Sequence, residues 1–192
     1  MTTSELDRKL FAAAERLGRA LRAARQELAT RHAISLLAVE ILQTLADSRT
    51  RRVGALAAEL DITQATTSDA LATLAGRGLV ARTSDPGDRR ATVVTLTDAG
   101  TELAWTIAGD LARLLPDADR DRAARGTALR VLLGEIARLH TAGIITVDRN
   151  CFSCQHYKAP AARARAHCLL LDLPLHDEDL RVDCPEHHPP PA

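Results

Sequence analysis

Apolar residues follow a helical period along most of this chain. Leucine, isoleucine, valine and alanine recur every three or four positions as far as Gly143, which predicts a series of amphipathic helices. The expected helices span residues 4–31, 35–47, 53–60, 63–76 and 97–115, and a last one runs from Asp117 or Asp119 to Gly143. The fold is therefore expected to be mainly α-helical.

The helical spacing of the apolar residues is interrupted once, between residues 79 and 96. Two short β-branched stretches, 79–83 and 91–96, flank the segment 84–90, whose Pro86-Gly87 pair is typical of a turn, so a β-hairpin is predicted. The basic segment 49–52 before the third helix is predicted to be a loop. Two short helices followed by a hairpin form a winged helix-turn-helix, whose second helix can enter the major groove of DNA.

The helix at 63–76 would then face DNA with its polar N-terminal part. Its residues Thr67, Ala70, Leu71 and Leu74 are expected to pack inward. The side chains left outside can reach base edges or phosphates, and guanidinium groups on the hairpin can enter a narrow minor groove. The candidate DNA contacts are Thr63, Gln64, Ala65, Thr66, Ser68, Asp69, Arg82, Asp88, Arg89 and Arg90.

Charge supports this interpretation only locally. The 192 residues carry 25 basic and 25 acidic side chains, so the net charge cannot attract DNA, whereas residues 49–90 hold seven arginines against five acids. No stretch of the sequence is apolar enough for a membrane span, and no secretory signal is evident at the start. A cytoplasmic protein that does not bind membranes is therefore expected.

Residues 38–100 resemble the multiple antibiotic resistance regulator (MarR) family. The resemblance rests on residues 53–57, 62–68 and 78–82, on Asp85-Pro86-Gly87-Asp88-Arg89-Arg90, and on the segment 95–100. It implies a homodimer that binds a pseudo-palindromic operator in double-stranded DNA, usually as a repressor, with the long terminal helices as the dimer interface. The sequence departs from the family pattern at Asp69, where a basic residue is common, and in the segment after the last helix.

That last segment is rich in cysteine. All four cysteines, six of the eight prolines and five of the seven histidines lie in the last 42 residues. Cys151 and Cys154 form a C-x2-C pair, and Cys168 and Cys184 follow singly, so four thiolates are available for one site. An iron–sulfur cluster is expected there, and structural zinc is the alternative. Five histidines are spare candidate ligands: His156, His167, His176, His187 and His188.

Four segments are thus expected. They are an N-terminal dimerisation helix (1–33), the winged helix-turn-helix (34–100), C-terminal dimerisation helices (101–143), and a cysteine-rich extension (144–192) that ends in a disordered tail.

The favoured function is a dimeric repressor that senses redox or iron state at the cysteines. One alternative is a regulator that responds to a small apolar effector and holds structural zinc, and the less favoured one is an electron-transfer protein or redox enzyme. Paired carboxylates, a Ser-His-Asp set and a phosphate-binding glycine loop are not evident in the sequence, so an enzyme is not expected.

Overall fold

The computed structural model describes residues 4–47, 50–114, 121–161 and 165–191. The chain divides into two compact units. The first contains residues 1–56 and 64–114, and the second contains residues 57–63 and 115–192. Each unit is described separately below.

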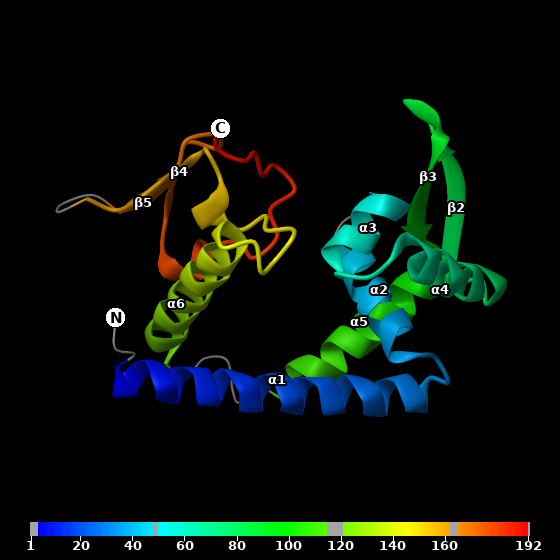
Figure 1. The fold of residues 1–192 in the computed structure, drawn as a ribbon, viewed down its shortest axis with the longest axis horizontal. Helices are drawn as coiled ribbons and strands as arrows, with labels where there is room; N and C mark the ends of the chain where they lie inside the picture. The colour runs from blue at the N-terminus through cyan, green and yellow to red at the C-terminus, as the bar shows by residue number, and fades with distance from the viewer. Residues whose placement is uncertain (1–3, 48–49, 115–120, 162–164, 192) are drawn as a thin grey trace. The chain divides into compact units, whose positions relative to one another are not determined.

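Helices build most of the first unit (Figure 1). They are α1 (Glu5–Arg31), α2 (Leu36–Asp47), α3 (Val53–Glu59), whose last three residues belong to the second unit, α4 (Gln64–Gly76) and α5 (Asp98–Ala112). Ser4 caps α1 and forms a capping box with Asp7, which confirms the expected start of that helix. The core is apolar, and its fully buried members include Val39, Ile41, Leu42, Leu56, Leu71, Leu74, Val94 and Ile107.

The predicted hairpin is present but is part of a three-stranded sheet. Its strands are β1 (Arg51–Arg52), β2 (Val80–Asp85) and β3 (Asp88–Leu96), in the order β1-β3-β2. The prediction of a loop at 49–52 was wrong for Arg51 and Arg52, which pair with Val94 and Val93. Residue 49 lies outside the described residues. The turn is also shorter than predicted, because β2 continues to Asp85 and β3 begins at Asp88, so Asp88, Arg89 and Arg90 lie in a strand.

A tight junction joins the end of α4, the sheet and the start of α5. Thr97 caps α5: its hydroxyl oxygen accepts from the Gly100 N–H at 3.1 Å and donates to the Gly78 carbonyl at 2.6 Å. Gly78 has φ of +70°, a conformation that ends helices and favours glycine. A Cβ at Gly100 would lie 1.9 Å from the Leu79 carbonyl oxygen. The start of α5 therefore lies directly against the Leu79 backbone, with no room for a side chain at position 100.

The second unit consists of α6 (Arg122–Thr141) and the cysteine-rich segment. That segment contains two 3-10 helices, η1 (Cys151–Ser153) and η2 (Asp177–Asp179), and a sheet of β4 (Tyr157–Lys158), β5 (Ala166–Cys168) and β6 (Leu173–Leu175). α6 packs against η2, where Arg130 pairs with Asp177 at 3.1 Å and Arg122 pairs with Glu178 at 3.0 Å. The absence of a side chain at Gly126 allows this packing, because a Cβ there would lie 3.1 Å from the Asp177 Cβ.

The limits of α6 agree in part with the prediction. The expected start at Asp117 or Asp119 lies outside the described residues, and the helix begins at Arg122. Gly143 follows the helix with φ of +73°, as expected for a residue that ends it. The two units also divide the chain differently from the four expected segments, because α5 belongs to the first unit and α6 to the second. None of the described helices is long and apolar enough to cross a membrane.

Candidate nucleic-acid interface and cysteine cavity

The N-terminal part of α4 presents polar side chains at the surface of the first unit. Thr67, Leu71 and Leu74 are buried, as the sequence predicted, because they share the inward face of the helix. The opposite face is exposed at Thr63, Gln64, Ala65, Thr66 and Asp69, and Ser68 is half-buried. The structure thus brings Thr63 and the five candidates of α4 together at the N-terminal end of that helix.

The wing carries the second group of candidates. Arg82, Asp88 and Arg90 are exposed, and the Arg90 N–H donates to the Asp88 carboxylate at 3.1 Å. The backbone of Arg89 lies in β3, and its side chain lies outside the described ones. Arg90 also lines a pocket with Arg52, Gln64 and Asp88, so the wing and the start of α4 share one concave surface.

Ion pairing fixes the tip of the wing. Arg52 Nε donates to Asp85 Oδ2 at 2.6 Å, and the Gly87 N–H donates to Asp85 Oδ1 at 2.8 Å. The hydrogen bond from Gly87 and the guanidinium of Arg52 lower the pKa of Asp85 below its ordinary value. Asp85 therefore stays charged and ties β1 to the hairpin turn, a role that the sequence did not reveal.

All four cysteines of the second unit line one cavity of about 410 Å³. The thiols are half-buried and form no disulfide, and burial raises the pKa of Cys151 and of Cys184. Two kinds of residue complete the lining. The apolar ones are Leu170, Leu171, Leu173, Pro174 and Leu175, and the polar ones are His156, Tyr157, Asp179, Arg181 and Glu186. Among the described residues, no three His, Cys, Asp or Glu side chains are grouped closely enough to hold a single metal ion. The four predicted ligands are thus gathered around one space but do not converge on one point.

Of the five spare histidines, the cavity lining includes His156. His167 pairs with Asp172, with 3.0 Å between His167 Nε2 and Asp172 Oδ1. The side chain of His176 lies 2.7 Å from Arg165 Nη1, and that of His187 lies 3.0 Å from the Ser153 hydroxyl. His188 Nδ1 lies 2.9 Å from the Glu186 carbonyl oxygen, and the ring of His188 contacts that of His156 edge-on.

Asn150 anchors the first two cysteines to α6. It is fully buried, and its side-chain amide donates to the Leu133 carbonyl at 3.1 Å. Its amide oxygen accepts from the Phe152 N–H at 2.7 Å and so caps η1, which carries Cys151. Asn150 was not predicted as a functional residue, although an asparagine directly before a C-x2-C pair is a recognisable cap signal.

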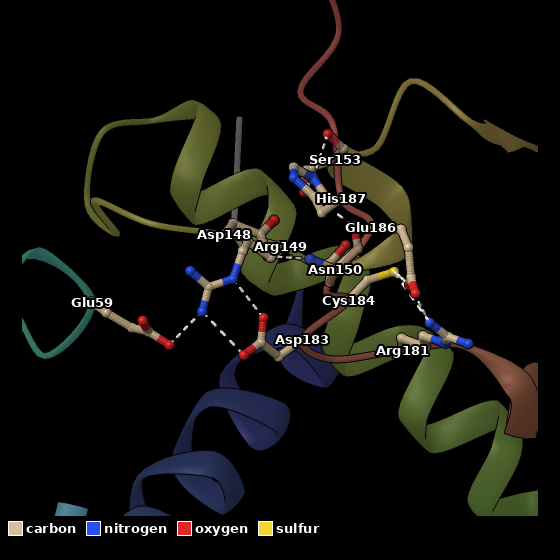
Figure 2. A network of polar contacts seen from close by, with 10 residues as sticks. All are labelled: Glu59, Asp148, Arg149, Asn150, Ser153, Arg181, Asp183, Cys184, Glu186 and His187. Atoms are coloured by element: carbon tan, nitrogen blue, oxygen red, sulfur yellow. Dashed lines mark hydrogen bonds and ion pairs between the residues drawn. The ribbon is translucent and has the colours of Figure 1, made fainter. Parts of the chain in front are cut away.

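Arg149 holds the segment that ends in Cys184 (Figure 2). Its guanidinium pairs with Asp183 and with Glu59, and Arg149 Nη2 lies 3.0 Å from Asp183 Oδ2. The hydrogen bond to Asp183, together with the charges of the two carboxylates, raises the pKa of Arg149. The Cys184 N–H donates to the Arg149 carbonyl at 3.0 Å, so this arginine fixes Cys184 through its backbone as well.

Comparison with known proteins supports the winged helix. Residues 34–92 match the model of the MarR family. The reduced form of AbfR bound to DNA is 20% identical with a TM-score of 0.54, and the match covers 70% of this chain and 94% of that one. CouR, a transcriptional repressor bound to a 23-mer DNA duplex, is 26% identical with a TM-score of 0.53 over 71% of this chain and 98% of that one.

A MarR transcriptional regulator from Methanosarcina mazei Go1 has the same fold. It is 23% identical with a TM-score of 0.58, and the match covers 69% of this chain and 99% of that one. No curated protein matches this chain significantly. The family match falls on α2, α3, α4 and most of the wing, the elements that form the exposed surface described above. Residues 34–92 therefore resemble the MarR family in sequence, and the likeness to the solved structures shows a winged helix-turn-helix fold.

Proposed function

We propose that this protein is a dimeric cytoplasmic repressor that binds a pseudo-palindromic operator and senses redox or iron state through an iron–sulfur cluster on its four cysteines. DNA binding is supported by the exposed α4 residues beside an arginine-bearing wing, and by the likeness to CouR, whose structure contains a DNA duplex. α4 would read base edges from Gln64 and Ser68, and the wing would contact the backbone and the minor groove.

Dimer formation is supported by an apolar face on α1. Leu6, Leu10, Phe11 and Leu17 are all more than half exposed within one chain. The spacing of Leu6, Leu10 and Leu17 places these three along one side of the helix, and an apolar stripe of this kind normally packs against a partner. A second copy of the chain would supply that partner and would place two copies of α4 over two half-sites.

Replacing Arg90 by alanine tests the wing contact. Removal of one exposed guanidinium near a phosphate should weaken binding to all DNA sequences to a similar degree, and it should reduce the slope of log K against log salt by about one unit. The slope is measured by fluorescence anisotropy across a salt series. The Arg138→Ala variant, in which an exposed arginine of α6 is removed, should retain the wild-type slope. Equal slopes for the two variants would contradict the wing assignment.

The observation that carries the cluster assignment is the shared cavity of the four cysteines. Zinc bound to four thiolates at about 2.3 Å requires the sulfurs to converge on one ion. A cluster contains several irons and sulfides, so its four thiolates surround a larger group. The cavity of about 410 Å³ and the spread of the thiols fit the larger group better. A bound cluster would supply a one-electron redox centre, and the four thiolates would hold it.

The experiment is purification without oxygen followed by iron, sulfide and zinc analysis. We expect a brown protein with iron and acid-labile sulfide. A colourless protein with one zinc per chain and no sulfide would overturn the cluster and support the alternative of a structural metal. Operator affinity is then compared between the loaded and the stripped protein. Equal affinities would reject a sensing role for the site.

The second unit has a direct covalent connection to α4. Residues 57–63 belong to that unit, and the chain continues from Thr63 into Gln64, the first residue of α4. Within the unit, Glu59 pairs with Arg149, and the Thr146 hydroxyl donates to the Ala58 carbonyl at 2.7 Å. A change of shape around the cysteines would thus be transmitted to the segment that leads into the reading helix, which explains how such a site could control DNA binding.

A further inference from the structure

Arg181 contacts two of the four sulfurs in different ways. Its backbone N–H donates to the Cys151 Sγ at 3.2 Å, and its guanidinium Nη1 donates to the Cys184 Sγ at 3.5 Å. The Cys151 N–H donates in return to the Arg181 carbonyl at 3.2 Å, which holds the backbone of Arg181 against that cysteine. Arg181 also lines the cavity that the four thiols share. Arg181 is therefore placed to change the charge distribution on the sulfurs of Cys151 and Cys184.

The carboxylate of Glu186 lies beside the guanidinium of Arg181 and carries the opposite charge. Its carboxylate Oε2 lies 2.7 Å from Arg181 Nη1 and 3.4 Å from the Cys184 Sγ (Figure 2). The guanidinium, the thiol and the carboxylate therefore form a compact triad at one wall of the cavity. A positive and a negative side chain act on the same sulfur, and each can be neutralised separately.

We propose that Arg181 is a positioning residue that raises the reduction potential of the cluster, and that Glu186 limits this effect. The inference rests on the proposed cluster. A bound cluster would accept one electron from a one-electron donor, and Cys151, Cys154, Cys168 and Cys184 would hold it in both states. The added negative charge is spread onto the sulfurs, so N–H donors and a nearby cation stabilise the reduced form. A nearby carboxylate destabilises it.

The test compares reduction midpoint potentials in anaerobic titrations with dithionite and redox mediators, followed by electron paramagnetic resonance. Arg181→Gln removes the cation but keeps the backbone N–H to Cys151, so the midpoint should shift to a more negative value. Glu186→Gln removes the opposing carboxylate and should shift the midpoint to a more positive value. Arg181→Lys keeps the charge and should recover most of the wild-type potential.

The outcomes separate this inference from the proposed function. Iron and sulfide content shows whether each variant assembles a cluster. A wild-type protein without iron overturns the cluster assignment and, with it, the role of Arg181. A full cluster with the same potential in both Gln variants overturns the role of Arg181 alone, because a merely structural contact would not produce shifts of opposite sign. Shifts in the same direction would also contradict it.

Discussion

The Cys168→Ser variant is expected to lose the visible absorption of the cluster and most of its bound iron. Cys168 lies on β5, the central strand of the small sheet, and it is one of the four thiols around the cavity. A serine hydroxyl is a much poorer ligand for iron than a thiolate, since soft sulfur ligands select for iron–sulfur clusters. With three thiolates left, we expect the iron and sulfide content to fall below about a tenth of the wild-type value, because metal binding and folding are coupled in small sites of this kind.

The same variant should also loosen the segment around the cavity. This segment contains short strands and 3-10 helices rather than an apolar core of its own, and two of its few well-buried apolar residues are Ala166 and Leu180. Limited proteolysis is therefore expected to cleave the variant between residues 144 and 191 much faster than the loaded wild type.

A matched control exists one residue away. His167 is also on β5, but it pairs with Asp172 and is not part of the cavity lining. The His167→Ala variant should keep its iron and its absorption. If Cys168→Ser keeps the full complement of iron, Cys168 is not a ligand; if His167→Ala loses it, the ligand set must be revised.

The second large effect is expected from Gly100→Ala in α5. The new Cβ would lie 1.9 Å from the Leu79 carbonyl oxygen and 2.9 Å from its carbon, and neither backbone atom can rotate away. The start of α5 would have to shift, which also disturbs the cap that Thr97 forms with Gly100 and Gly78. We expect a loss of about 3 kcal/mol or more in the free energy of unfolding. That corresponds to a fall of about 10 °C in Tm.

Gly109→Ala on the same helix is the control. A Cβ at Gly109 meets nothing within 4 Å, so alanine should favour the helix by up to about 1 kcal/mol. Thermal and urea unfolding, followed by circular dichroism, measure both variants. Equal stabilities would show that the close contact between Gly100 and Leu79 does not restrict α5. A stabilised Gly109→Ala beside a destabilised Gly100→Ala would confirm that the contact, and not glycine replacement in general, decides the result.

The helices and the polar tip of α4 could be predicted because their signals are local. Thr67, Leu71 and Leu74 lie on one helical face by their spacing alone, and their burial leaves Gln64 and Asp69 outside. β1 could not be found in this way. Arg51 and Arg52 form a two-residue strand without an alternating pattern, and they become a strand only by pairing with β3.

The contacts around the cysteines depend on distant parts of the chain. The spacing of the cysteines predicts four ligands for one site, and in the structure the four thiols line one cavity. Arg181 reaches Cys151 across 30 positions, and Arg149 reaches Asp183 across 34. Sequence spacing contains no information on such pairs. The exact strand limits of the wing also depend on register, so Asp88 and Arg90 were placed in a turn although they begin β3.

The membership of residues 57–63 in the second unit has a consequence for protein engineering. A designer who transplants the cysteine-rich segment onto another winged-helix scaffold by joining residues 115–192 to its C-terminus would leave Glu59 behind. Arg149 would then have Asp183 but not its second carboxylate. The second unit can therefore be transferred whole only as two separate pieces of sequence, and a simple tail fusion would transfer only one of them.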